Sequence, residues 1–512
     1  MENNVWIEDT KKGVWEKYIR NKGITMCCIY IFAIFCVFMQ FMHFYITHDH
    51  VPGGNVPMTM SMVDIMGALS SGRFVNILIV AIYWLLDKIR VGHYSNLYVI
   101  QFLGIILYGI SAAILYTIVE TYFQSIYSKI VGFVCILIAY TNPLMTETYT
   151  YGAFDWGIAV LLSIIAAIML ARRKWLLGFI FSFLTVSTYQ ADILIVVIVA
   201  FLLTFLLYYD DSVRIKLTGY IYITVLSGSA TIINLLLQRV GVAVNGGQTA
   251  KTVSFMEGLV DKIQTIRYIA WYCVWVETYN MFPKWGLFIY FCTIFLVGLF
   301  ILAFNKSRLI IWFEWIICSL LVFVGPFLFG LAMAIPGYPQ RTMLSLFFGI
   351  AMYSVACMFL TKNMKNIQKV VSGVICIFAL TTVFMTETTI LDCYIVRAID
   401  ENEIECIYSE LREYEIETGN AIKEIAYKAQ SNERLVYDEQ FIQFNYYTYA
   451  MRMVAKNWSR VSYINYLKGS DYKSREMTDD EYESFFSGEG LSVYNPSLQL
   501  AFEDHTMYWL IY

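Results

Sequence analysis

Long apolar runs separated by short polar segments recur along the first three quarters of the chain. A transmembrane helix needs about 20 predominantly apolar residues, and most of these runs approach that length. The runs predict passes at Ile24–Ile46, Phe74–Leu86, Leu97–Val119, Trp156–Ala171, Leu176–Gln190, Ile193–Tyr209, Leu217–Leu237, Gly286–Phe304, Ile310–Ile335, Met343–Leu360 and Val370–Ile390. We therefore expect an all-α polytopic membrane domain with about eleven passes.

One apolar run, Ile130–Tyr140, is too short for a full pass. The basic residues Arg172 to Lys174 nevertheless require the following helix to end on the cytoplasmic side. A re-entrant element satisfies both conditions, because such backbone is tolerated where it is buried in protein or lines a cavity. The sequence thus predicts a re-entrant segment within Thr121–Asp155, on the outer side.

Basic residues between Lys11 and Lys22 precede the first run, so the positive-inside rule places the N-terminus in the cytoplasm. The later basic clusters, Lys88 and Arg90 included, are then all predicted inside. This alternation divides the chain into a cytoplasmic leader (1–23), a polytopic domain (24–390) and an extracytoplasmic C-terminal domain (391–512).

Two polar regions outside the predicted passes have elements of their own. Between Gln238 and Pro283, an aromatic stretch from Tyr268 to Tyr279 indicates an interfacial helix, which either anchors the protein or shapes the mouth of a lipid-binding groove. In the C-terminal domain, Asp400–Lys428 has the spacing of an amphipathic helix. Short alternating segments follow and predict a small α/β or α+β domain: Arg434–Tyr437, Arg460–Leu467 and Met507–Tyr512.

Composition agrees with a membrane protein, because 58% of residues are hydrophobic and only 15% are charged, against about 25% charged in soluble domains. The net charge of -4 and the lack of a basic stripe argue against nucleic-acid binding. Most of the eleven cysteines lie in apolar runs without metal-ligand spacing. Cys393 and Cys406 are the exceptions, because they lie in the polar C-terminal domain, where they could pair unless a helix between them holds them apart.

Polar residues in or beside membrane passes are costly and so are functional candidates. Here they gather on the predicted outer side: His48, Asp49, His50, Asp64 and Arg73 in the first loop, then Glu147, Asp155, Tyr189, Gln190 and Arg341. The first loop ends in Gly-Arg, Tyr-Gln stands at a helix junction, and Arg341 follows a proline turn. This pattern resembles the bacterial Gtr-type (GtrII-like) membrane glucosyltransferases of the GT-C class.

The resemblance implies a glucosyltransferase that moves a hexose, usually glucose, from a polyprenyl-phosphate carrier to a cell-envelope glycan such as O-antigen. The reaction would take place on the outer face of the bacterial cytoplasmic membrane. The implied partners are the lipid-linked donor, the glycan acceptor and the bilayer. Relatives tend to carry adjacent acidic residues in the first loop, whereas here two histidines flank a single aspartate.

Such a transfer needs a general base and cations for the departing phosphate. Asp49 is the candidate base and Asp64 its reserve, although Asp64 also suits a helix N-cap. Arg73 and Arg341 suit forked contact with phosphate, or could contact lipid headgroups instead. Tyr189 and Gln190 would bind sugar hydroxyls or simply pack between helices.

The cofactor question stays open. His48, Asp49, His50, Glu147 and Asp155 together offer ligands for a divalent metal, but their spacing matches no defined site. Two other functions compete with sugar transfer: a lipid-linked glycan flippase or transporter, which would be expected to show repeats and charges near the membrane midplane, and an envelope glycan polymerase or ligase.

Overall fold

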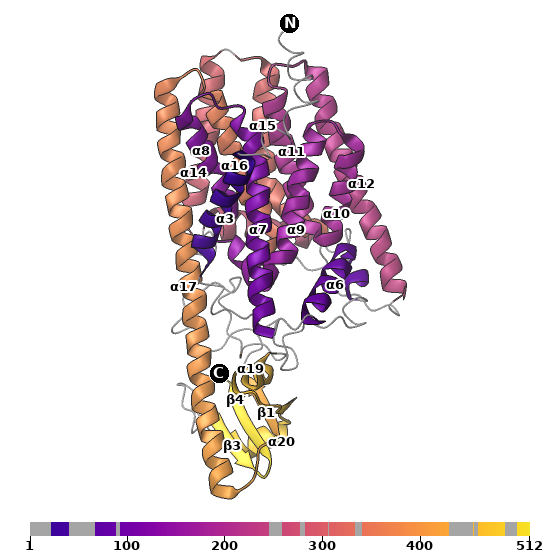
Figure 1. Cartoon of the computed structure of the whole chain (residues 1–512), viewed down its shortest axis with the longest axis vertical. Helices are drawn as coiled ribbons and strands as arrows, with labels where there is room; N and C mark the ends of the chain where they lie inside the picture. The colour runs from indigo at the N-terminus through magenta and orange to yellow at the C-terminus, as the bar shows by residue number, and fades with distance from the viewer. Residues whose placement is uncertain are drawn as a thin grey trace. The chain divides into compact units, whose positions relative to one another are not determined.

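The computed structural model describes residues 22–39, 67–88, 93–244, 259–276, 282–305, 307–332, 340–429, 454, 459–486 and 499–511. These residues form two compact units, and the division falls within one long helix, between Glu387 and Thr388. The first unit is a bundle of apolar helices, and the second is a small sheet with short helices (Figure 1).

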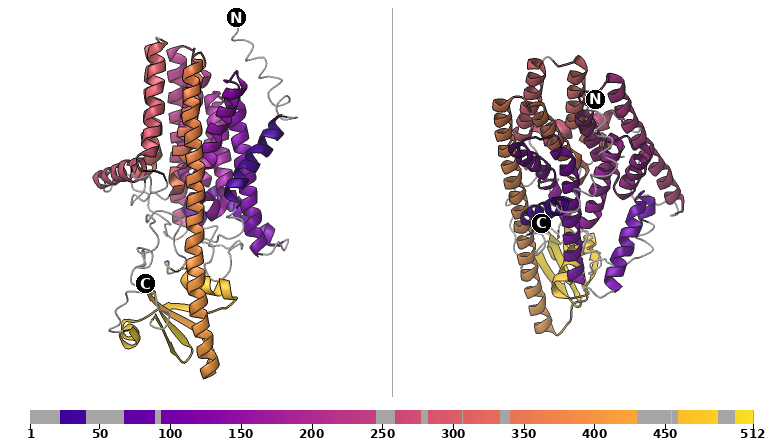
Figure 2. Two further views of the ribbon diagram at one scale, coloured as in Figure 1. Left: turned by 90° about the vertical axis from the view of Figure 1, so that its left-hand side faces the viewer. Right: turned by 45° about the horizontal axis from the view of Figure 1, so that its top comes forward.

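The bundle is built from helices most of which run side by side (Figure 2). They are α3 (Ile24–Phe38), α6 (Phe74–Lys88), α7 (His93–Glu120), α8 (Ile126–Tyr140), α9 (Met145–Ala171), α10 (Trp175–Thr188), α11 (Ile193–Leu207), α12 (Val213–Val244), α13 (Leu259–Arg267), α14 (Gly286–Phe304), α15 (Leu309–Val324), α16 (Leu344–Leu360) and the first part of α17 (Lys365–Thr418). Short helical turns are η4 (Gln190–Asp192), η5 (Tyr268–Val276), η7 (Gly325–Ala332) and η8 (Gln340–Met343).

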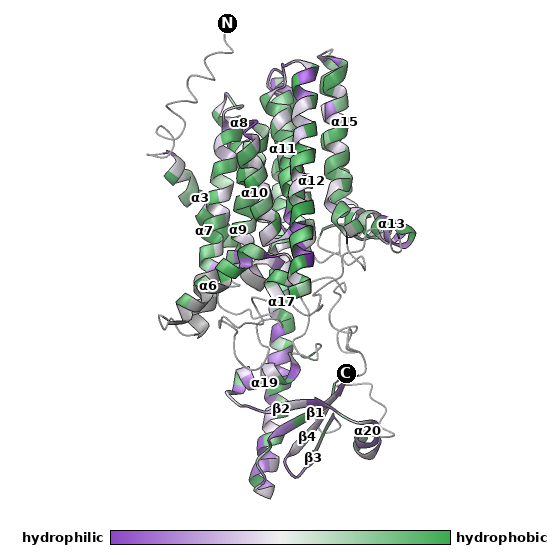
Figure 3. Cartoon of the chain, turned by 90° about the vertical axis from the view of Figure 1, so that its right-hand side faces the viewer, coloured by the Kyte–Doolittle hydropathy of each residue, from purple (hydrophilic) through white to green (hydrophobic). Residues whose placement is uncertain are grey.

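Within the described residues, eight helices are long and apolar enough to cross a membrane, and α3, α8 and α10 are shorter apolar helices. Hydrophobic residues cover most of their length (Figure 3). Every residue of α16 is buried, which places this helix at the centre of the bundle. These features agree with a helical membrane domain, while the number of passes stays a prediction.

Small residues let the inner helices approach closely, as is common between membrane helices. A Cβ atom on Gly104 of α7 would lie 2.3 Å from the backbone of Ala153 on α9. One on Gly298 of α14 would lie 2.1 Å from the ring of Trp315. A larger side chain at either position would have to push two helices apart.

Helix α7 runs opposite to α3, whereas the basic clusters predicted that both run outward. Lys22, before α3, forms an ion pair with Glu120 at the end of α7, with 2.6 Å between Nζ and Oε1. Near the other end of α3, the rings of Phe35 and Phe102 lie 6.4 Å apart. Because α7 begins at the end of the bundle where α3 stops, the intervening α6 does not cross, and the predicted pass at 74–86 is wrong.

In place of the predicted re-entrant segment, the structure has two helices, α8 and α9, joined by a short turn. Helix α8 runs parallel to α3, since Lys129 at its start also pairs with Glu120 and the Tyr30 hydroxyl donates to the Phe133 carbonyl at 3.2 Å. The turn into α9 is closed by Asn142, whose amide donates to the Ala139 carbonyl at 2.9 Å. A 15-residue helix suffices because α7 and α16 pack against it.

The segment 259–276 lies across the direction of the bundle helices (Figure 3). Tyr268, Trp271 and Tyr272 are exposed, while Trp275 is fully buried and stacks on Phe323 with 4.6 Å between ring centroids. An exposed aromatic face beside a buried anchor is typical of a helix at a membrane interface. Anchoring and groove-shaping both stay open as its role.

The second unit begins in α17 and contains a four-stranded sheet with the order β2-β1-β4-β3. Its strands are β1 (Glu424–Ala429), β2 (Lys473–Glu476), β3 (Leu500–Glu503) and β4 (Thr506–Ile511), and its helices are α19 (Arg460–Lys468) and α20 (Asp479–Phe486). Strand β1 is parallel to β2 and β4, and β3 is antiparallel to β4.

Two sequence interpretations of this unit can be compared with the structure. The segment 460–467 is a helix and not a strand, because its buried residues follow helical spacing: Arg460, Val461, Tyr463, Ile464 and Asn465. The segment 507–512 falls on β4, and 434–437 lies outside the described residues. Cys393 and Cys406 both lie on the single helix α17.

Candidate functional site

Six of the ten predicted site residues belong to the described chain, and all six lie at one end of the bundle, the end opposite Lys22. Arg341 and Glu147 contact each other, and Arg73 has Tyr189, Arg341 and Asp155 within electrostatic range. Gln190 directly follows Tyr189. The remaining four, His48, Asp49, His50 and Asp64, lie outside the described residues.

Arg341 and Glu147 join two elements that are almost 200 positions apart. Glu147 occupies the first turn of α9, where the helix dipole favours a carboxylate. Both its oxygens are used, since one accepts from the backbone N–H of Arg341 and the other from the Arg341 guanidinium. Only 2% of the Glu147 side chain is exposed, against 24% for Arg341. The pair therefore fixes η8 on α9 and leaves part of the guanidinium accessible.

Tyr189 is the central aromatic residue of the site. It has extended backbone (φ -150°) where α10 stops and η4 begins, so the chain breaks between two helices at this point. Its ring lies 4.1 Å from the ring of Trp156 on α9. The guanidinium carbon of Arg73 lies 5.2 Å from the ring centroid, within the range of a cation–π interaction.

Arg73 follows the sharp turn at Gly72 and precedes α6. Its Nε atom is buried and has no hydrogen-bond partner among the described residues. A buried donor without a partner is costly in a native protein and calls for an unseen partner such as water or a ligand. Arg73 and Arg341 together supply two guanidinium groups at one site, which suits an anion with several oxygens.

Asp192 stands with Tyr189 and Gln190 among the polar residues of the helix junction, but the sequence analysis gave it no role. It lies in η4, three residues after Tyr189, and only 1% of it is exposed. Its Oδ2 atom has no hydrogen-bond partner in the part of the chain that the structure describes. Buried carboxylates in membrane helices are rare, so its place in an otherwise apolar segment was the available sequence signal.

Gln190 was predicted to bind a sugar hydroxyl. In the structure its side-chain Nε2 donates to the backbone carbonyl of Ser71, so at least this nitrogen is used within the protein. Binding of sugar by Gln190 stays a prediction.

The described residues contain no cluster of three or more side chains able to hold a metal ion. Three of the five residues considered as ligands, His48, Asp49 and His50, lie outside these residues. The metal hypothesis therefore stays a prediction.

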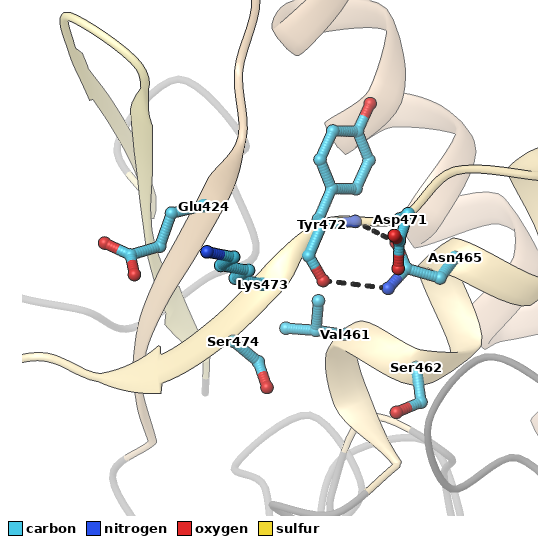
Figure 4. Close-up of a pocket in the computed structure, with 8 residues that line it drawn as sticks. All are labelled: Glu424, Val461, Ser462, Asn465, Asp471, Tyr472, Lys473 and Ser474. Atoms are coloured by element: carbon cyan, nitrogen blue, oxygen red, sulfur yellow. Dashed lines mark hydrogen bonds between the residues drawn. The ribbon is translucent and has the colours of Figure 1, made fainter.

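The second unit has a separate polar pocket of about 440 Å³ (Figure 4). Its lining residues come from the starts of β1 and β2, from α19 and from the loop between α19 and β2: Glu424, Val461, Ser462, Asn465, Asp471, Tyr472, Lys473 and Ser474. The Asn465 amide holds this loop, accepting from the Tyr472 N–H at 2.8 Å and donating to the Tyr472 carbonyl at 2.9 Å. With two carboxylates and one ammonium group, the pocket is unsuited to phosphate.

The chain matches no protein-family model and no curated protein sequence. The residues of the site itself are therefore the basis for a proposed function.

Proposed function

We propose that this protein is a membrane glycosyltransferase that uses a polyprenyl-phosphate hexose, with glucose as the expected sugar, and transfers it to a cell-envelope glycan. The observation that carries the proposal is the meeting of Arg73 and Arg341 beside carboxylates at one end of an apolar bundle. A lipid-linked donor would bring its phosphate to such a place, because its tail stays in the bilayer.

In the proposed reaction, an acceptor hydroxyl oxygen attacks the anomeric carbon of the hexose. The bond between that carbon and the phosphate oxygen breaks, and the phosphate leaves on its lipid. A carboxylate takes the hydroxyl proton, and the two arginines stabilise the charge that develops on the phosphate. Asp49 is the proposed base and Asp64 the reserve.

The distribution of basic residues supports an outward-facing site. Lys22, Arg173, Lys216 and Lys362 gather at the opposite end of the bundle: Lys22 pairs with Glu120, Arg173 lies over Tyr208, and both lysines 216 and 362 lie near Tyr209. By the positive-inside rule this end faces the cytoplasm. The site would then face outward in a bacterial cytoplasmic membrane.

Transfer by the purified full chain tests the proposal. Given polyprenyl-phosphate glucose and an envelope glycan acceptor, the protein should attach the sugar, and Arg73→Ala should remove most of this activity. Asp49→Asn should reduce transfer by about 10²- to 10⁴-fold, the usual contribution of a general base. If Asp64→Asn has this effect and Asp49→Asn does not, Asp64 is the base.

The same assay separates the competing functions. A flippase would move the donor between leaflets without attaching its sugar, and a polymerase or ligase would use only oligosaccharide donors. Absence of hexose transfer with every monosaccharide donor would contradict the proposal.

A further inference from the structure

Three side-chain amides hold the turn of backbone that precedes Arg73. Each donates to a different carbonyl of three consecutive residues: Gln238 to Ser70 at 3.2 Å, Gln190 to Ser71, and Asn234 to Gly72 at 2.7 Å. We call Gln190, Asn234 and Gln238 the amide clamp. Its members lie more than 100 positions along the chain from the turn they hold, so the bonds join η4 and α12 to the start of α6.

The conformation of the turn requires a glycine at position 72. Gly72 has φ +73°, a conformation that side chains with a Cβ atom rarely adopt. A Cβ atom there would lie 2.9 Å from the side-chain oxygen of Asn234 and 3.1 Å from the Gln190 amide nitrogen. Asn234 is fully buried and also donates to the Ser187 hydroxyl at 3.2 Å.

Helix α12 is otherwise an apolar and largely exposed helix, with exposed residues such as Ile232, Leu236 and Val240. Asn234 and Gln238 are one helical turn apart and therefore lie on one face. Further along the same helix, Gly241 lies close to the Leu69 carbonyl, since a Cβ atom there would be 2.4 Å from that oxygen. Apolar side chains at positions 234 and 238 would only pack α12 against the turn. The amides also donate hydrogen bonds, which fix the direction of the carbonyls in the turn.

We propose that the amide clamp positions Arg73 to bind the phosphate of the donor. This inference rests on the proposed function, which assigns phosphate binding to Arg73. The Tyr189 ring lies against the Arg73 guanidinium. Gln190, the neighbour of Tyr189, donates to the carbonyl of Ser71, two residues before Arg73. Forked contact with phosphate requires a fixed guanidinium direction, and a displacement of about 1 Å can cost about 100-fold in rate.

Binding of polyprenyl monophosphate to the full chain in nanodiscs tests the clamp. Asn234→Leu and Gln238→Met remove the donors while keeping similar volumes, and each should weaken binding by about three- to tenfold. Thr224→Ala is the matched control, because this exposed residue of α12 bonds only within its own helix. It should bind like the wild type.

A double-mutant cycle gives the readout that a merely structural role would not produce. In the Arg73→Ala background, the clamp substitutions should cause no further loss, because the group they position is gone. Equal losses with and without Arg73 would overturn the positioning role. If Asn234→Leu fails to fold, Gln238→Met, at a half-buried position, completes the cycle.

Failure of this inference differs from failure of the proposed function. If Arg73→Ala binds polyprenyl monophosphate as well as the wild type, phosphate binding at Arg73 is wrong, and the clamp loses its role with it. If Arg73→Ala binds weakly but both clamp variants bind normally, the proposed function stands and the clamp is refuted.

Discussion

The two ends of the bundle bury charged side chains in different ways. Away from the site, Lys216 and Glu314 are 1% and 3% exposed and form an ion pair of 2.8 Å, and the Lys216 ammonium also donates to the Tyr209 carbonyl at 2.7 Å. At the site end, Arg341 and Glu147 are paired, but Arg73 and Asp192 form no ion pair with another described residue.

This difference shows that a buried charge alone does not indicate a functional site. Lys216 and Glu314 neutralise each other and join α12 to α15, although Glu314 Oε1 has no hydrogen-bond partner among the described residues. A buried charge without an opposite charge beside it carries a cost that a structural role does not explain. We therefore expect substitutions at the matched pair to change stability, and substitutions at the site to change activity.

The largest expected effect is on stability, at the matched pair. Lys216→Met leaves Glu314 buried without its partner and should destabilise the bundle by about 3–5 kcal/mol. The double variant Lys216→Met/Glu314→Leu should recover most of this loss, because well-packed apolar residues often replace a buried pair. Thermal unfolding of the protein in detergent measures both. Equal loss in the single and double variants would contradict a closed, matched pair.

A smaller change, in activity, is expected at Arg341. Arg341→Lys keeps the charge but loses the planar fork, so transfer should fall at least about tenfold. Stability should change little, because the backbone N–H of residue 341 still donates to Glu147. Transfer and thermal unfolding of the same preparation provide the measurements. Full activity in the lysine variant would reduce Arg341 to a contact with lipid headgroups.

The sequence predicts individual charged residues of the site, but not contacts between residues that are far apart in the chain. Arg73, Glu147 and Arg341 were selected because charged residues stand out in apolar surroundings. Asn234 and Gln238 gave no such signal, because the turn they hold is more than 160 positions away. The clamp becomes visible only when α12 is packed beside that turn.

Errors in the predicted fold have similar causes. Lys88 was interpreted as part of an inner cluster, but the positive-inside rule applies to the ends of spanning helices, and α6 does not span. Helix α8 was missed because Ile130–Tyr140 looked too short, although the helix begins earlier, at Ile126. In the second unit, Arg460–Leu467 was interpreted as a short alternating segment, but its buried residues lie on one helical face.

Asp192 tests the same difference between the two ends, at a buried carboxylate of the site. Asp192→Asn keeps the shape and removes the charge, so a carboxylate buried without a partner should be replaced at no cost, or with a gain of up to about 1 kcal/mol. Transfer should nevertheless fall, if the carboxylate is kept for a ligand. Unfolding and transfer measured together decide this. If the variant is destabilised by several kcal/mol, Asp192 has a structural partner, as Lys216 and Glu314 have in each other.

The smallest effect is expected at a partly exposed pair in the second unit. Arg475 donates to both carboxylate oxygens of Glu481 at 2.7 and 2.6 Å, and Glu481 also accepts from the Thr478 N–H at the start of α20. The Arg475 hydrogen bonds lower the pKa of Glu481 to about 2, from an ordinary value of about 4.3. A lowered pKa means that the stabilisation is present above about pH 5 and is lost as the pH falls toward 2.

Solvent screens this pair, so its contribution should stay below about 1 kcal/mol, in contrast to the buried pair of Lys216 and Glu314. Amide hydrogen exchange over residues 473–486 of the full chain, corrected for intrinsic rates, should show less protection at pH 3 than at pH 6. Glu481→Gln should lose part of this pH dependence and keep the rest of the exchange pattern. An identical pH dependence in both proteins would mean that the partly exposed pair contributes nothing measurable, and that only buried charges in this chain carry stability.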